Sequence, residues 1–350
     1  MRIPQKLRDL APYDPTEGMP AVKLDANESF LSLPDNIANK VSKAVSEVLL
    51  NRYPDPMTKD VCKAAANYFG VEYDQIVAGN GSDELISILV NSFLEKGSKI
   101  LVTKPDFSMY AFYAEMAEVE VISTPKTERN IDVKALISEA KAQRADAVFF
   151  SNPCNPTGGG ITREEVISIS KELPETLVVV DEAYMDFWNQ SILGDITALD
   201  NVIVLRTCSK AFGLAGIRLG FAIARKEIID LIKKAKSPFN INSMTQVAAC
   251  AVLEEKEYLR SAIDEIVASR EELQMELLEV AKSTNGKIKV LPSYANFVIV
   301  ESLLAEAIFE KLMERDIVVR KFPTFLRITA GSRDENKKLV AAMREILADC

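Results

Sequence analysis

The sequence predicts an α/β protein: a large domain with a mostly parallel central sheet covered by helices on both faces, then a smaller α+β C-terminal domain. Two observations support this prediction. Short apolar runs alternate with helical patterns from about residue 75 to 245, and most of these runs are apolar at successive positions. Strands of that kind are buried on both faces, as in parallel sheets. After residue 254 the pattern changes to a long helix followed by a shorter mixed unit.

Six apolar runs are the expected strands of the large domain. They cover residues 100–102, 119–122, 147–150, 177–180, 202–205 and 220–223. Helical patterns lie between them. One helix is expected to begin at Thr162, because Thr162 and Glu165 have the spacing of a capping box.

The C-terminal part begins with a helical stretch over about 243–282, with a possible break near Glu254. Expected strands and helices then follow at 297–300, 303–315, 317–319 and 326–328, and a second capping box at Ser332 and Glu335 opens the last helix. The first 30 residues are rich in proline and turn residues and are expected to form an extended arm. We therefore divide the chain into an arm (1–30), a large domain (31–254) and a small domain (255–350).

Composition narrows the possible partners. The 350 residues carry a net charge of −9 without a basic block, which argues against nucleic-acid binding. The N-terminus has no apolar signal core, and no apolar run approaches the roughly 20 residues that span a bilayer. Five scattered cysteines without C-x-x-C spacing are typical of reduced thiols. We expect a cytoplasmic protein that binds small molecules rather than a membrane.

The chain contains no histidine. This excludes Ser-His-Asp and Cys-His catalysis and most transition-metal chemistry, so no metal site is expected. Proton transfer must then depend on Lys, Tyr, Asp or Glu, or on a cofactor.

Lys210 lies just after the apolar run 202–205. A lysine at the end of a buried strand is partly desolvated, and desolvation lowers the pKa of its ammonium group. The neutral amine can then attack an aldehyde and form a Schiff base. Lysines at strand ends are common, so this reading depends on what the neighbouring strand ends carry.

Two other strand ends carry complementary side chains. Asn155 follows the run 147–150, and Asp181 and Tyr184 follow the run 177–180. Ligands of parallel α/β sheets bind outside the carboxyl edge of the strands, so these residues should converge on one pocket with Lys210.

These residue types suit pyridoxal 5'-phosphate. Lys210 would form the Schiff base, and Asp181 would stabilise the protonated pyridine nitrogen by its opposite charge. The protonated ring would serve as an electron sink for a carbanion at the substrate α-carbon. Asn155 and Tyr184 can hydrogen-bond the phenolic oxygen of the ring. Each residue alone also fits a plain structural role, such as a helix cap, a core tyrosine or a turn, and it is their order that favours the cofactor.

A phosphate site is expected where the turn 79–84 opens an apolar helix, because a glycine-containing turn there presents free backbone N–H groups to an anion. The turn is neither a P-loop nor G-x-G-x-x-G, and an ordinary N-cap is the alternative. Ser209 and Arg218 add a hydroxyl and a guanidinium group, which suits a phosphate.

With these residues in place, the chain resembles the fold-type I pyridoxal-phosphate aminotransferases and, within them, the histidinol-phosphate aminotransferases. The resemblance covers nearly the whole chain in motif order. It rests on the stretches 24–29, 52–55, 79–84, 105–110, 151–158, 181–184, 209–218 and 326–331. It implies an enzyme of histidine biosynthesis that interconverts histidinol phosphate and 2-oxoglutarate with imidazole-acetol phosphate and glutamate.

The resemblance also implies roles around the cofactor. The ring of Phe107 would stack on the cofactor ring, and the backbone of Ser82 and Asp83 would hold the phosphate. Tyr53 would reach the cofactor phosphate of the neighbouring subunit, which implies a homodimer.

For the substrate, the resemblance implies that Arg327 takes the α-carboxylate of glutamate or 2-oxoglutarate. Arg320 and Tyr13 would line the far end of the substrate site. The arm at 12–18 is longer and more acidic than is usual in the family, and the segment 321–325 is shorter than in many relatives. Both departures touch substrate choice. A threonine-phosphate decarboxylase or an aromatic amino-acid aminotransferase therefore remains open. A cofactor-sensing regulator is disfavoured, because no basic DNA-binding module is present.

Overall fold

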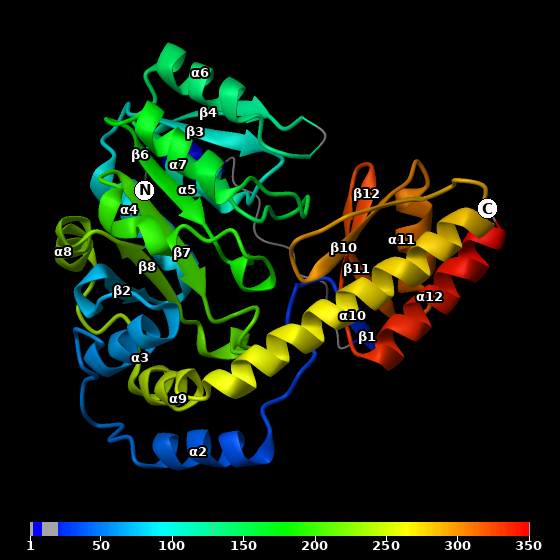
Figure 1. Cartoon of the computed structure of the whole chain (residues 1–350), viewed down its shortest axis with the longest axis horizontal. Helices are drawn as coiled ribbons and strands as arrows, with labels where there is room; N and C mark the ends of the chain where they lie inside the picture. The colour runs from blue at the N-terminus through cyan, green and yellow to red at the C-terminus, as the bar shows by residue number, and fades with distance from the viewer. Residues whose placement is uncertain (1–2, 9–19, 128, 350) are drawn as a thin grey trace.

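The computed structural model describes residues 3–8, 20–127 and 129–349. Two sheets organise these residues. One has seven strands in the order β2-β8-β7-β6-β5-β3-β4, and the other has five in the order β1-β11-β12-β10-β9. The long helix α10 (Lys256–Ser283) runs from the side of α9 across the smaller sheet (Figure 1). The predicted fold class is confirmed.

The seven-stranded sheet is parallel except at one strand. Its strands are β2 (Ile76–Gly79), β3 (Lys99–Lys104), β4 (Glu120–Pro125), β5 (Ala147–Ser151), β6 (Leu177–Asp181), β7 (Val202–Thr207) and β8 (Gly220–Ala224). The neighbours from β4 to β7 pair in parallel, whereas β8 pairs antiparallel with both β7 and β2. The sequence analysis missed β2, a short run that ends in Gly79 and leads directly into the next helix.

Both faces of this sheet are buried, which explains its unbroken apolar runs. Within β6, Val178 and Val180 belong to one core cluster and Val179 belongs to another. The helices of this part are α2 (Asp35–Ser46), α3 (Lys59–Phe69), α4 (Gly81–Phe93), α5 (Met109–Met116), α6 (Val133–Gln143), α7 (Arg163–Glu172), α8 (Lys226–Ala235) and α9 (Ser243–Leu253). Residues of α4, α5 and α8 pack on one face, and residues of α3, α6, α7 and α9 pack on the other.

The smaller sheet has a core of its own. Its strands are β1 (Val22–Leu24), β9 (Lys289–Leu291), β10 (Phe297–Glu301), β11 (Ile317–Phe322) and β12 (Phe325–Thr329), and α11 (Ala305–Met313) and α12 (Arg333–Ala348) pack with α10 in the same cluster. Leu259 and Ile266 of α10 belong to a core cluster of the larger sheet, whereas Leu273 and Leu277 belong to that of the smaller one. Helix α10 therefore ties the two cores together.

One segment of the expected arm forms regular structure instead. Val22–Leu24 pair in parallel with Ile317–Val319 of β11, so β1 is an edge strand of the smaller sheet. The side chains of Val22 and Leu24 are buried there, because this short apolar run completes the small core. A short helix, α1 (Gln5–Arg8), precedes it in the described part of the chain. The consequence is that residues just after β1 are fixed between the two sheets.

Local signals in the sequence match the observed ends of helices. Both capping boxes are formed, with the Thr162 and Ser332 side chains accepting hydrogen bonds from the backbone of Glu165 and Glu335. The expected break near Glu254 separates α9 from α10.

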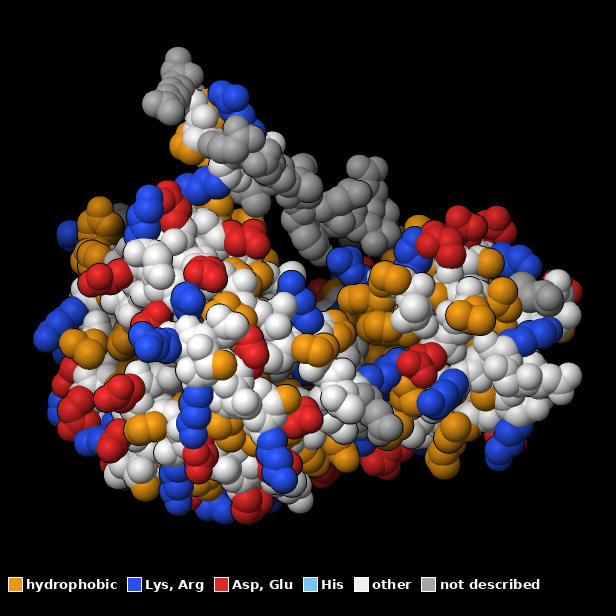
Figure 2. All heavy atoms as spheres, turned by 90° about the horizontal axis from the view of Figure 1, so that it is seen from above, with side chains coloured by type: hydrophobic (Ala, Val, Ile, Leu, Met, Phe, Trp, Pro, Cys, Tyr) orange, Lys and Arg blue, Asp and Glu red, His pale blue; other side chains and the backbone are white. Residues whose placement is uncertain are grey.

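Within the described ranges, every helix is too short or too polar to cross a membrane. On the face in Figure 2, acidic and basic side chains are interspersed rather than gathered by sign.

Candidate active site

The site lies at the carboxyl edge of β5, β6 and β7, three neighbouring parallel strands. Asp181 is the last residue of β6 and pairs with Ser151, the last residue of β5. Asn155 and Lys210 lie in the loops that follow β5 and β7. The side chains are therefore brought to one edge by strand order alone.

Lys210 is a partly buried amine at this edge. Its Nζ donates a hydrogen bond to the carbonyl oxygen of Ala26 at 2.9 Å and lies 6.0 Å from the centre of the Tyr184 ring. Burial, the largest cause, lowers the pKa of Lys210 to about 8, and the positive charge of Arg327 adds to this effect. A lysine with such a pKa has a larger deprotonated fraction near neutral pH than an ordinary lysine, as a nucleophile or a general base requires.

Asp181 is a buried carboxylate with both oxygens engaged. Its Oδ2 accepts a hydrogen bond from the Tyr110 hydroxyl at 2.8 Å, and its Oδ1 accepts one from the Ala183 backbone at 3.0 Å. Burial, the largest cause, raises the pKa of Asp181 to about 6, while these two hydrogen bonds oppose the rise. Tyr110 was not predicted as a site residue, because a tyrosine in an apolar helix is typical of a core position.

Tyr184 is buried next to Lys210, and its hydroxyl oxygen accepts a hydrogen bond from Asn27 Nδ2 at 2.8 Å. Burial, the largest cause, raises the pKa of Tyr184. Asn27 was also missed as a site residue. It belongs to the motif 24–29, but nothing in the sequence shows that this segment meets a loop more than 150 residues away.

The N-terminus of α4 has the features of an anion site. Within the described structure, its N-cap residue Asn80 makes no side-chain hydrogen bond to the helix. Gly81 has a φ of +80°, and a Cβ there would lie 2.7 Å from Arg218 Nη2. Arg218 Nη1 donates to Ser209 Oγ at 3.2 Å. Backbone N–H groups of a first helical turn beside a guanidinium group suit a phosphate.

The backbone of β8 approaches the first turn of α4 closely at this anion site. A Cβ on Gly220, the first residue of β8, would lie 2.4 Å from the backbone nitrogen of Ser82. Asp83 stands beside Arg218, with Oδ2 3.9 Å from Nη2. Burial, the largest cause, raises the pKa of Asp83 and the Arg218 charge opposes it.

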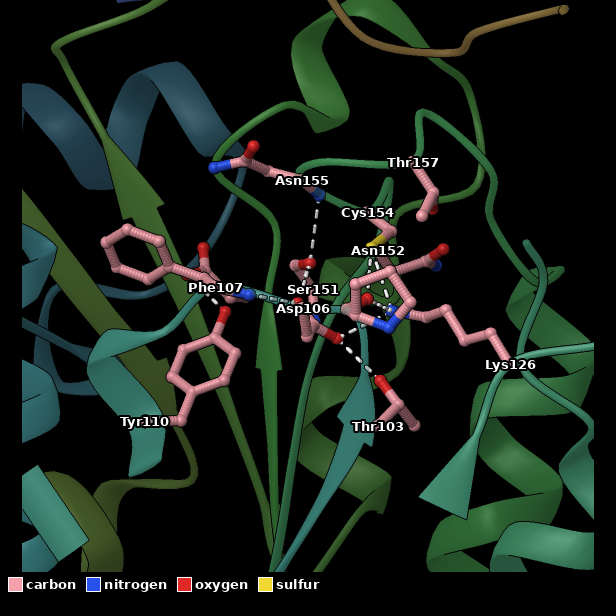
Figure 3. A network of polar contacts seen from close by, with 12 residues as sticks. Thr103, Asp106, Phe107, Tyr110, Lys126, Ser151, Asn152, Cys154, Asn155 and Thr157 are labelled. Carbon is pink, nitrogen blue, oxygen red and sulfur yellow. Dashed lines mark hydrogen bonds and ion pairs between the residues drawn. The ribbon is translucent and has the colours of Figure 1, made fainter. Parts of the chain in front are cut away.

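Asp106 connects the loops that carry Phe107 and Asn155 (Figure 3). Its Oδ1 accepts hydrogen bonds from the Phe107 backbone at 2.8 Å and from the Ser151 hydroxyl, and Ser151 Oγ accepts from the Asn155 backbone at 3.1 Å. Its Oδ2 forms a buried ion pair with Lys126 Nζ at 2.9 Å. This network fixes both loops, and the sequence analysis missed it because its members are scattered along the chain.

Arg327 reaches the site from the smaller sheet. Its Nη1 donates to Asn155 Oδ1, and its Nη2 donates to the carbonyl oxygen of Asp25. Arg320 on β11 is the direct partner of Arg327 on β12, so both side chains lie on the same face of the antiparallel pair. This face of the pair therefore carries two arginines.

One predicted residue lies elsewhere. Tyr53 is 83% exposed in the loop between α2 and α3, and its ring stacks on that of Phe239 with 4.7 Å between the ring centres. Tyr13 lies outside the described residues.

The comparison with known families decides the class of protein. The sequence model of the family described as aminotransferase class I and II matches residues 20–343. The chain belongs to this family. Aminotransferases of this family depend on pyridoxal phosphate, so the predicted cofactor and the predicted class of enzyme are confirmed.

Individual relatives agree over the whole length. The histidinol-phosphate aminotransferase of Clostridium kluyveri is 41% identical over 349 residues, which is 98% of each chain. The crystal structure of histidinol-phosphate aminotransferase from Sinorhizobium meliloti in complex with pyridoxal-5'-phosphate has a TM-score of 0.89 at 25% identity, covering 99% of this chain and 98% of that one. L-threonine-O-3-phosphate decarboxylase from Porphyromonas gingivalis, with a TM-score of 0.79 at 21% identity over 93% of this chain and 99% of its own, shows the same fold only.

The described side chains fit the cofactor of this aminotransferase family. The α4 N-terminus and Arg218 have the chemistry that would hold its phosphate, and Gly81 and Gly220 leave the room that a Cβ would fill. Lys210 offers an amine that is readily deprotonated. Asp181 offers a buried carboxylate whose burial favours a cationic partner, because an unpaired buried charge is costly.

Proposed function

We propose that this protein catalyses the reversible transfer of an amino group between histidinol phosphate and 2-oxoglutarate, giving imidazole-acetol phosphate and glutamate, a reaction of histidine biosynthesis. The observation that carries the proposal is the full-length similarity to histidinol-phosphate aminotransferases, in a chain that keeps a deprotonable lysine at the site. Pyridoxal phosphate supplies the electron sink for a carbanion at the substrate α-carbon.

In this proposal the residues of the larger sheet bind the cofactor and move protons. Lys210 Nζ takes and returns the proton at the substrate α-carbon, for which its pKa of about 8 is well suited. Asp181 keeps the pyridine nitrogen protonated. Asn155 and Tyr184 bind the phenolic oxygen, and the ring of Phe107 covers the cofactor ring.

The phosphate-binding residues are assigned on geometry. The backbone of Ser82 and Asp83 lies in the first turn of α4, and Ser209 and Arg218 are joined by a hydrogen bond beside it. We assign all four to the cofactor phosphate. Their combined arrangement of N–H groups, a hydroxyl and a guanidinium group would neutralise a dianion from several sides.

The substrate residues are assigned to the smaller sheet. Arg327 would bind the α-carboxylate of glutamate or 2-oxoglutarate, and Arg320 would bind the anionic far end of either substrate. The support is their position as direct cross-strand partners on one face, because two guanidinium groups there suit a substrate with two anionic ends. Tyr13 is assigned to the same end on the family resemblance.

We propose a homodimer in which Tyr53 completes the phosphate site of the neighbouring subunit. The support is an exposed apolar group formed by Leu49, Leu50, Tyr53 and Phe239, which are 67%, 75%, 83% and 40% exposed in the single chain. Exposed apolar patches of this kind mark protein–protein contacts.

We also propose a cytoplasmic location, which the free cysteines of the described residues support. The division of the chain into two domains after residue 254 stays a prediction.

The test is a spectral half-reaction on the purified, cofactor-loaded protein. We expect histidinol phosphate at low concentration to bleach its visible absorption band, while phenylalanine and phosphothreonine leave it unchanged. Bleaching by phenylalanine instead would favour an aromatic aminotransferase. Release of carbon dioxide from phosphothreonine would overturn the proposal in favour of a decarboxylase.

A further inference from the structure

Three consecutive residues after β1 each contact a different group of the site. The carbonyl oxygen of Asp25 accepts a hydrogen bond from Arg327, that of Ala26 accepts one from Lys210 at 2.9 Å, and Asn27 Nδ2 donates to the Tyr184 hydroxyl at 2.8 Å. Asp25 and Ala26 act through their backbone, which any residue could supply. Asn27 alone acts through its side chain, so its identity matters.

The surroundings of Asn27 fix which end of its amide faces Tyr184. The Asn27 backbone N–H donates to Thr329 Oγ1 at 3.0 Å, so the Thr329 hydroxyl proton is free to donate to Asn27 Oδ1 at 3.2 Å. Asn296 Nδ2 holds the Asn27 carbonyl oxygen at 3.0 Å. With Oδ1 occupied by Thr329, the Nδ2 end is directed to Tyr184.

Asn27 itself is well held in this position. It is 1% exposed, and its φ of +54° lies in the left-handed region, which asparagine tolerates better than most residues. The residue is therefore buried, conformationally unusual and hydrogen-bonded at both ends of its side-chain amide. Such a combination in a loop indicates a specific demand on the side chain rather than general packing.

A tyrosine hydroxyl has one proton to donate and lone pairs to accept with. Because Asn27 donates to the Tyr184 oxygen, that oxygen is an acceptor toward Asn27 and its own proton points elsewhere. Building on the proposed function, we propose that Asn27 is a positioning residue that directs the Tyr184 proton toward the phenolic oxygen of the cofactor. Asn27 touches no reacting atom in this assignment and acts only through Tyr184.

The consequence is a shift in a proton equilibrium. A donor directed at the phenolic oxygen stabilises its anionic form, so the pH-dependent change in the visible absorption of the loaded protein should occur at lower pH than without that donor. Losing the direction of the Tyr184 proton should raise the midpoint. Among the described residues, the charged and titratable groups around Tyr184 are Lys210, Arg327, Asp181 and Cys154. The hydrogen bonds of the Asn27 side chain go to Tyr184 and Thr329 rather than to these four groups.

The experiment is a pH titration of visible absorption in the cofactor-loaded resting protein, without substrate. Asn27→Gly removes the amide and tolerates the positive φ. We expect it to raise the midpoint by about one pH unit, the size of losing one ordinary hydrogen bond. Asn285→Gly is the matched control, because Asn285 is exposed and also has a positive φ, of 52°. It should leave the midpoint unchanged.

Two further variants make the result decisive. Thr329→Val, which frees the Asn27 amide to rotate, should raise the midpoint by a smaller amount and covers the case in which Asn27→Gly does not fold. In a Tyr184→Phe background, Asn27→Gly should cause no further shift. Wild-type midpoints in Asn27→Gly and Thr329→Val, or an undiminished shift in the Tyr184→Phe background, would overturn the proposal. Since no substrate is used, this outcome is independent of whether histidinol phosphate is the amino donor.

Discussion

The groups at the edge of the seven-stranded sheet come from successive strands, whereas those near the smaller sheet come from segments far apart in the sequence. Asn155, Asp181 and Lys210 follow β5, β6 and β7 in order. Arg327 instead meets Asp25, 302 positions away, through a hydrogen bond. Strand order alone thus gathers the groups that we assign to the cofactor, whereas the groups that we assign to the substrate depend on how the two cores are held together.

This difference suggests a division of labour. The cofactor is common to both half-reactions, so changes at the larger sheet should affect donor and acceptor equally. The smaller sheet, with Arg320 and Arg327 side by side on one face, should discriminate between substrates. The segment 25–27 contacts groups of both sheets.

The largest expected effect is that of Lys210→Ala. The variant loses both the amine and the base, so we expect steady turnover to fall by at least about 10⁴-fold in both directions. Binding of the cofactor should persist, because the α4 N-terminus and Arg218 remain. Steady-state rates and cofactor content by absorbance check this, with Lys171→Ala, an exposed lysine on α7, as the control. Rapid multiple turnover by Lys210→Ala would contradict the assignment.

The next effect is that of Asp181→Ala, which removes the charge that we assign to the pyridine nitrogen. We expect both half-reactions to slow by about 10²–10³-fold, the range seen when one preorganised electrostatic partner is removed. Single-turnover rates with each substrate check this. A loss of rate with one substrate only would contradict the assignment of the larger sheet to the cofactor, because it would place Asp181 in substrate recognition.

Asp181 also leads to a prediction for the protein without cofactor, in which its replacement should increase stability rather than reduce activity. Burial raises its pKa to about 6, so its contribution to stability is fully present below about pH 4 and is lost as the pH rises through about 6. Asparagine has no charge to bury. Above pH 6, the free energy of unfolding of the Asp181→Asn apoprotein should therefore exceed that of the wild-type apoprotein by about 1–3 kcal/mol. Thermal unfolding of both apoproteins at pH 5 and pH 7.5 measures it. An equal difference in stability between the two apoproteins at both pH values would argue against a costly buried charge at Asp181.

The sequence predicted the larger sheet well, because burial on both faces leaves unbroken apolar runs and strand ends can be read directly. It missed β2, which is only four residues long, and it placed β1 in an arm because three residues next to a proline-rich stretch carry little periodic signal. Both strands are short, and each pairs with a strand far away along the chain, so the pairing leaves no local pattern.

Within the site, the sequence identified residues whose type is unusual for their place, such as Lys210 after a buried strand. Three residues of the site were not predicted from the sequence: Asn27, Asp106 and Tyr110. Each of them hydrogen-bonds a side chain that lies far away along the chain. Asn27 and Tyr184 are 157 positions apart, and Asp106 and Ser151 are 45 apart. Contacts of this kind are set by tertiary structure and leave no spacing in the sequence.

A smaller and selective effect is expected for Arg327→Lys. Lysine keeps the charge but loses the bidentate geometry that arginine offers a carboxylate. We expect the KM for 2-oxoglutarate to rise by about 10–100-fold, with a smaller change for histidinol phosphate, which has no carboxylate. Half-reaction kinetics with each substrate measure the difference. Equal losses for both would show that Arg327 acts mainly by holding Asn155, to which its Nη1 donates.

The smallest expected effect tests whether the larger sheet of one chain completes the cofactor site alone. If Tyr53 serves the neighbouring subunit, Tyr53→Phe removes one hydrogen bond and should weaken cofactor binding by about 3–10-fold while the dimer stays intact. Tyr73→Phe, another exposed tyrosine, is the matched control. Leu50→Asp should separate the subunits in sedimentation and weaken cofactor binding at least as much, although Tyr53 is unchanged in sequence. Full affinity in a monomeric Leu50→Asp variant would show that one chain is sufficient, because its own N–H groups at α4 and Arg218 would then account for all of the phosphate binding.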